Sequence, residues 1–221
     1  MESSKDDAGS GRKLGKPKHH HWVEIISAVL MAIATVASAW SAYQASRWHG
    51  TETSLYADAN AARIHASEAA ELADQQITVD AGLFSDYCYA YYEGNLALSE
   101  FYENNLFRPE MKAAVEAWKA LKPLGNPAAP KSPFEMEEYK NENRERSVKL
   151  ELSAQGKTND AGRAIEHSDR YVLMTVLFAS VLFFAGISTK FDSFQVKAFL
   201  LGFGWMLFIV TVVFLVLQPV K

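Results

Sequence analysis

The sequence predicts an all-α membrane protein: three transmembrane helices, with an extramembrane helical hairpin or coiled-coil-like domain between the first and the second. Overall composition hides this, because 49% apolar residues and a mean hydropathy of -0.09 are typical of a soluble protein. The prediction depends on how the apolar residues are distributed along the chain. Apolar residues gather towards the two ends of the 221-residue chain, and the middle is polar and charged.

The second and third spans are the clearest elements. Residues 171–189 contain no charge over 19 residues, and residues 198–217 contain none over 20. A helix rises 1.5 Å per residue, so about 20 apolar residues cross a hydrocarbon core of about 30 Å. The intervening residues 190–197 suit only a tight turn. The alternative, two buried helices of a soluble protein, needs a domain that surrounds both, and this chain is too short to supply it.

The first span, residues 22–44, is apolar but rich in small side chains. Ala34, Ser38 and Ala42 recur every four residues and therefore share one helix face. Small residues let helix backbones approach closely in lipid, so we predict that these three pack against another helix.

The first span also has the features of a cleavable signal peptide. A basic N-terminal tail (residues 1–21, predicted to be disordered) precedes an apolar run and the tripeptide Ala37-Ser38-Ala39. Against cleavage, the helical pattern continues through residues 37–39, and a leader of about 39 residues is longer than the usual 15–30. Both interpretations place the following domain on the same side of the membrane.

Positive charge predicts the topology. Four basic residues lie shortly before the first span, and only Arg47 follows it within 15 residues (Arg12, Lys13, Lys16 and Lys18 precede it). The positive-inside rule then puts the N-terminus in the cytoplasm and residues 45–170 outside it, in a multi-pass protein of the plasma (inner) membrane.

The domain at residues 45–170 is acidic, with 14 basic and 21 acidic side chains and a net charge of -7. Such a balance argues against nucleic-acid binding, which needs clustered Lys and Arg. Cys88 is the only cysteine, so an internal disulfide and a cysteine-based zinc site are both excluded.

Alanine heptads predict how this domain packs. Residues 45–81 continue the first helix, and its alanines form two series with a spacing of seven (Ala62 and Ala69; Ala59, Ala66 and Ala73). We predict a close helix–helix seam along them. High helix propensity alone is the alternative explanation, because alanine is the best helix former.

Three further helical segments are expected. An aromatic helix at 83–106 is interpreted as amphipathic, with a ligand platform as the alternative. A short helix opens at Pro109, a proline-rich loop follows, and a capping box at Ser132–Glu135 starts a long charged helix that enters the second span.

We find no catalytic motif and predict that the protein is not an enzyme and has no cofactor or metal. Glu24, His65 and His167 are the polar side chains with the strongest claim to a role. Glu24 is acidic at the edge of a span, and the two histidines need partners brought by folding before they can bind a metal.

Residues 39–50 (AWSAYQASRWHG), the alanine-rich helix after them and residues 183–191 (FFAGISTKF) resemble a group of uncharacterised bacterial three-span membrane proteins. The order of one span, a helical domain and a terminal hairpin also resembles bacterial proteins of the DUF4337 kind. The resemblance implies a retained first span and transfers no activity.

The sequence therefore predicts a non-enzymatic membrane protein that acts through helix association, as a scaffold or an accessory subunit. Its expected partners are the lipid bilayer and either copies of itself or other membrane subunits. The alternative is a homo-oligomeric channel or transport component lined by Ser27, Thr35, Ser38 and Ser41. A membrane enzyme or sensor with a tyrosine-rich pocket is a third hypothesis.

Overall fold

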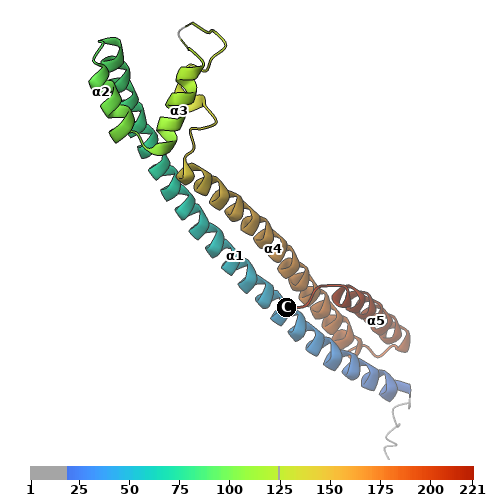
Figure 1. Ribbon diagram of the computed structural model, residues 1–221. Helices are drawn as coiled ribbons and strands as arrows, with labels where there is room; N and C mark the ends of the chain where they lie inside the picture. The colour runs from blue at the N-terminus through green and yellow to red at the C-terminus, as the bar shows by residue number, and fades with distance from the viewer. Residues whose placement is uncertain (1–18, 124) are drawn as a thin grey trace, which may run out of the picture. The chain divides into compact units, whose positions relative to one another are not determined.

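The computed structural model describes residues 19–123 and 125–221, with the backbone alone for 19–21. All regular structure in this part of the chain is helical (Figure 1). The elements are α1 (His19–Tyr92), α2 (Leu96–Phe101), the π-helix η1 (Tyr102–Leu106), α3 (Pro109–Ala120), the 3-10 helix η2 (Pro133–Glu135), α4 (Glu142–Ser188) and α5 (Phe194–Val216).

Three of these helices are long and apolar enough to cross a membrane. Their most apolar windows have mean hydropathies of 1.9 in α1, 2.1 in α4 and 2.6 in α5. The all-α class and the three membrane-spanning candidates are therefore confirmed. Most of the predicted tail 1–21 lies outside the described residues, but the first helix already begins at His19.

The chain folds as two compact units. One consists of the described residues up to Glu52 together with Gly162–Lys221, and the other of Thr53–Ala161. We call them the apolar unit and the polar unit. Helices α1 and α4 each contribute to both, so neither unit is a continuous stretch of sequence.

In the apolar unit, α1 and α4 run antiparallel. The hydroxyl of Ser27 lies 3.1 Å from that of Ser188, and Ser168 donates to the carbonyl of Ala45 at 3.0 Å. Large side chains of α4 and small ones of α1 fill the core between them (Leu30, Ala34, Ala45, Tyr171, Met174, Phe178, Val181, Ala185 and, from α5, Leu201). A hydroxyl–hydroxyl bond inside this core avoids the cost of two unpaired polar groups.

Helix α5 approaches α1 and α4 at a glycine. A Cβ added at Gly204 would lie 3.6 Å from Leu30 and 3.7 Å from Phe184, so only a small residue fits there. After α5 ends, the chain returns to α1. The amide of Gln44 and the indole of Trp48 bond to the backbone of Lys221 and Pro219.

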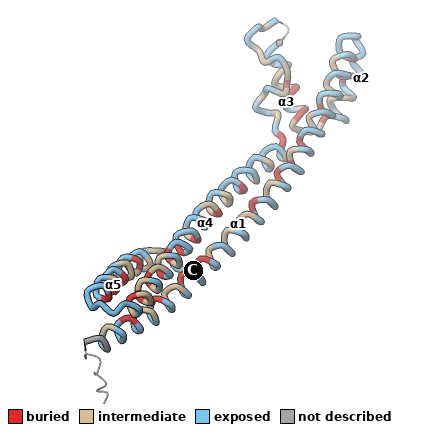
Figure 2. The backbone as a smooth tube through the Cα atoms, turned by 180° about the vertical axis from the view of Figure 1, so that it is seen from behind, coloured by how far each residue is buried: buried red, intermediate tan, exposed pale blue. Residues whose placement is uncertain are grey.

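In the polar unit, α1 and α4 again run antiparallel (Figure 1). Lys157 pairs with Asp58 near one end, and Asn141 donates to the carbonyl of Ala73 towards the other. Within this unit the buried positions form a narrow series along α1, separated by three, four or seven residues (Figure 2). That periodicity is the one expected of helices packed side by side.

The remaining elements form a helical head on the polar unit. Tyr87 on α1 packs against Phe107, Met111 and Val115, and Phe84, Phe134 and Tyr139 surround this core. The aromatic rings meet largely edge to face, with centroids about 5–6 Å apart, as aromatic pairs prefer. The tyrosine-rich segment is thus partly core, as its amphipathic interpretation predicted.

Two predicted helix boundaries are wrong. The first helix does not stop near residue 82 but continues to Tyr92, where Gly94 turns the chain with a φ of +76°. The long fourth helix begins at Glu142 rather than after Ser132. Asn141 provides its N-terminal bond, accepting from the amide of Arg144 at 3.0 Å, whereas Ser132 makes no side-chain cap.

Candidate functional site

The predicted packing residues of the first span are divided between two faces. Ala34 is fully buried in the apolar unit, Ser38 is partly buried, and Ala42 is exposed. The face of α1 that meets α4 follows Ser27, Leu30, Ala34 and Ser41 instead. The buried line along α1 combines steps of three, four and seven residues, and the four-residue series Ala34, Ser38 and Ala42 crosses from it to the exposed side.

Small residues also dominate the opposite face of the same helix. Ala28, Ala32, Thr35, Ala39 and Ala42 are spaced by four, three, four and three residues, and all are exposed. We call this the outer small-residue face. No described helix covers it, and the predicted residue Ala42 belongs to it.

The alanine seam of the polar unit agrees with the heptad pattern. Ala59, Ala66, Ala69 and Ala73 are buried, and Ala62 lies beside them, half-buried. Their counterparts on α4 include Ala154 and Ala161, both fully buried. These α4 alanines were not predicted, although their spacing of seven is a signal that could have identified them.

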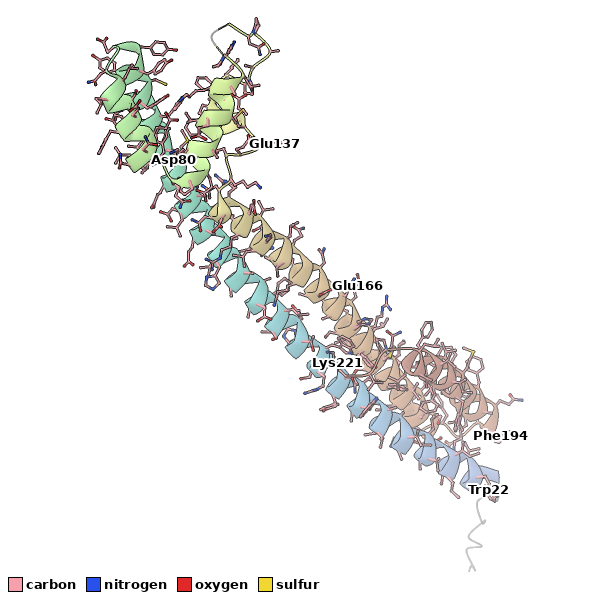
Figure 3. The ribbon with its side chains drawn as sticks, viewed as in Figure 1. Trp22, Asp80, Glu137, Glu166, Phe194 and Lys221 are labelled. Atoms are coloured by element: carbon pink, nitrogen blue, oxygen red, sulfur yellow. The ribbon has the colours of Figure 1, made fainter. Side chains whose placement is uncertain are left out.

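A buried ionic cluster fixes the base of the head, where Asp80 lies on α1 (Figure 3). Arg108 donates from Nε to Asp80 at 2.7 Å and from Nη1 to the carbonyl of Lys140 at 3.1 Å. The hydroxyl of Tyr139 donates to the same Asp80 oxygen at 2.7 Å. Three separate segments of chain therefore meet at one carboxylate.

This environment shifts two pKa values. Burial, and then the hydrogen bond to Asp80, raise the pKa of Tyr139 to about 12. Burial alone would lower the pKa of Arg108, but its hydrogen bonds to Asp80 and Tyr139 outweigh burial and raise it. Sequence reasoning missed this cluster, because its members lie up to 59 residues apart and follow no motif.

The three polar candidates lie apart from one another. Glu24 is exposed in the first turns of α1. His65 pairs with Glu68 one turn away, with Nδ1 3.0 Å from the carboxylate. The ring of His167 packs against that of Trp48 at a tilt of 42°, with ring centroids 4.6 Å apart, and its buried Nδ1 has no hydrogen-bond partner among the described residues. No group of three metal-ligating side chains occurs in the described part of the chain.

No family model, curated protein or solved structure matches this chain. The resemblance to three-span proteins of the DUF4337 kind therefore stays a prediction. The candidate site consists of surfaces for helix packing: the outer small-residue face in the apolar unit, and the alanine seam and the head in the polar unit.

Proposed function

We propose that the protein is a non-enzymatic, multi-pass membrane protein that acts through helix association, as a scaffold or as an accessory subunit of a membrane complex. In this proposal it lies in the plasma (inner) membrane, and residues 45–170 are extracytoplasmic. The charge bias before the first span supports the orientation.

The outer small-residue face of α1 carries this proposal. Its five members, Ala28 to Ala42, follow the alternating three- and four-residue spacing of one helix face. Contact between alanine and lipid adds little stability. Contact between alanine and another helix lets the two backbones approach closely and adds dispersion energy. Val36 on the same helix is 70% exposed, and its larger apolar side chain is typical of a residue that faces lipid.

The test is purification of the full-length protein in a gentle detergent at its natural expression level, followed by native mass measurement of the intact assembly. A homo-oligomer supports a self-assembling scaffold. Stable co-purification with other membrane subunits supports an accessory role. A compact monomer with no co-purifying chain would overturn the proposal.

Two substitutions test whether the outer small-residue face mediates this assembly. Ala32→Leu and Ala39→Leu add bulk at the centre of the outer small-residue face and should dissociate the assembly. Ala179→Leu, at an exposed position in the apolar part of α4, is the matched control with the same change in volume. Equal effects of all three substitutions would remove the outer small-residue face from the proposal.

The channel alternative has less support from the geometry. Ser27 and Ser41, two of its four predicted pore-lining residues, are fully buried within a single chain, and Ser27 is bonded to Ser188. Several first spans arranged around a pore would expose only Thr35 and part of Ser38 to it. Ion flux through liposomes containing the protein would nevertheless establish the channel.

A further inference from the structure

A pocket of about 390 Å³ opens on the head of the polar unit, beside the aromatic core that contains Tyr87. Its walls are the rings of Tyr87, Tyr91, Tyr92 and Trp118. Ligand sites in proteins have volumes of about 300–1,000 Å³ and are lined mainly by apolar and aromatic side chains with a few polar groups. The size and the lining both fall within that class.

The aromatic walls are held in place by their own contacts. Trp118 donates from its indole nitrogen to the carbonyl of Pro130 at 2.8 Å, and its ring meets Phe84 edge to face at 5.6 Å. Tyr87 is almost fully buried and packs on Phe107 at 5.5 Å. Trp118 and Tyr87 are therefore ordered before a ligand enters, which reduces the entropy cost of binding, whereas Tyr91 and Tyr92 are 50% and 62% exposed.

Two lysines give the pocket its charge. Lys119 lies 3.0 Å from the carboxylate of Glu103 and 5.7 Å from the centre of the Tyr87 ring, so its charge is already partly balanced. Lys122 is exposed at the edge of the pocket, and no carboxylate pairs with it among the described residues. The pocket therefore offers one cation beside a group of aromatic rings.

The backbone at Lys122 is strained. Its φ of +49° is in the left-handed region, which costs a residue with a side chain about 1–2 kcal/mol. It is the one non-glycine residue with positive φ in the described part of the chain. Strained residues of this kind cluster at ligand-binding positions. Lys122 directly follows Leu121, the C-cap of α3, where a left-handed residue commonly ends a helix, so α3 ends at the edge of the pocket.

We propose that this pocket binds a small planar aromatic molecule that carries an acidic group, with the ring between Tyr91, Tyr92 and Trp118 and the acid at Lys122. Stacking on several rings selects an aromatic ligand, and a single ammonium selects an anion. An aliphatic acid of similar size would lack the stacking, and a neutral aromatic amide would lack the ion pair.

Cys88 provides a direct reporter, because it lines the pocket and is the only cysteine in the chain. Burial raises the pKa of its thiol, so alkylation is best followed at mildly alkaline pH, where some thiolate forms. The experiment measures the rate of Cys88 alkylation in the full-length, detergent-solubilised protein, with naphthoate as the probe. Naphthamide and decahydronaphthalene-carboxylate are the size-matched neutral and non-aromatic controls.

The proposal expects naphthoate to slow alkylation about tenfold at a concentration near ten times its Kd, because only the empty pocket reacts. Lys122→Gln should weaken naphthoate about threefold, the scale of an exposed ion pair, and remove its advantage over naphthamide. Lys131→Gln, an exposed lysine outside the pocket, should change nothing. Tyr92→Leu should weaken both aromatic probes about fivefold, and Tyr89→Leu neither.

Equal protection by naphthoate and decahydronaphthalene-carboxylate, or none by either, would overturn the proposal. Equal effects of Lys122→Gln and Lys131→Gln would also overturn the role of Lys122. If the thiol reacts too slowly to follow, titration calorimetry with the same three probes and the same variants gives the same comparison.

Discussion

Gln44 on α1 holds the backbone of Lys221 with both atoms of its side-chain amide. Its Nε2 donates to the Lys221 carbonyl at 3.2 Å, and its Oε1 accepts from the Lys221 amide at 3.0 Å. Figure 3 shows Lys221 beside α1. Trp48 and Tyr171 both donate to the carbonyl of Pro219, each at 3.2 Å. The end of the chain is therefore fixed to two helices of the apolar unit.

Gln44→Leu removes both bonds from a fully buried position and should release the tail, at a cost of about 0.5–1.5 kcal/mol for each hydrogen bond lost, since the freed backbone groups of exposed Lys221 can bond to water. Faster hydrogen exchange of the Lys221 amide, which reports how often the tail is released, measures the change. Gln75→Leu, at an exposed position of the same helix, is the control. An unchanged exchange rate in Gln44→Leu would show that the pairing does not hold the tail.

Asp80→Asn should destabilise the head by about 1.5–3 kcal/mol, because it removes the buried negative charge that pairs with the half-buried guanidinium of Arg108. Arg108 keeps its bonds to Glu110 and Lys140 in this variant, so the lower end of that range is expected. Hydrogen exchange of the amides in α3 measures the loss. Asp86→Asn, an exposed aspartate on the same helix, should leave exchange unchanged.

Tyr139 should make the head sensitive to alkali. Its folded pKa is about 12 against an ordinary value of 10, so the folded state holds the proton more tightly than the unfolded state. This contribution to stability is complete below pH 10 and is lost as pH rises from 10 to about 12. Tyr139→Phe should therefore be less stable than wild type at pH 8 but should lose less stability between pH 10 and 12. Unfolding curves at pH 8, 10 and 12 measure the free energy of unfolding of wild type and variant, with Tyr89→Phe as control.

Ala73→Leu inserts a large side chain into the fully buried alanine seam of the polar unit and should cost about 1–3 kcal/mol by overpacking. Ala61→Leu, at an exposed position of the same helix, should lie within about 0.5 kcal/mol of wild type. Thermal unfolding followed by circular dichroism compares the two. Similar melting temperatures for both variants would contradict a close-packed seam.

Gly204→Leu and Gly202→Leu make a matched pair on α5. A side chain at Gly204 meets Leu30 and Phe184, whereas one at Gly202 meets nothing within 4 Å. The first substitution should separate α5 from α1 and α4 and lower the melting temperature in detergent, and the second should not. Gly204→Ala should be tolerated, since the nearest contacts of 3.6–3.9 Å are ordinary van der Waals distances.

The sequence by itself determined the helical class and the three apolar helices, and it predicted the alanine seam. These properties depend on residue type and short periods along one chain: uncharged runs of about 20 residues are long enough to cross a membrane, and alanines seven residues apart share a helix face. Helix ends were less predictable. Tyr92 rather than residue 82 ends α1, because Gly82 keeps a helical backbone and the glycine with positive φ lies at 94.

Only the tertiary structure decided which faces are used and which distant groups meet. Which face of α1 is buried depends on where α4 and α5 pack. Ala34 is therefore buried and Ala42 exposed, although both belong to one series with helical spacing. The bond of Gln44 to Lys221 spans 177 residues, and that of Tyr139 to Asp80 spans 59. No local pattern records such a contact, because burial and pairing are set by the folded arrangement of helices and not by neighbours in sequence.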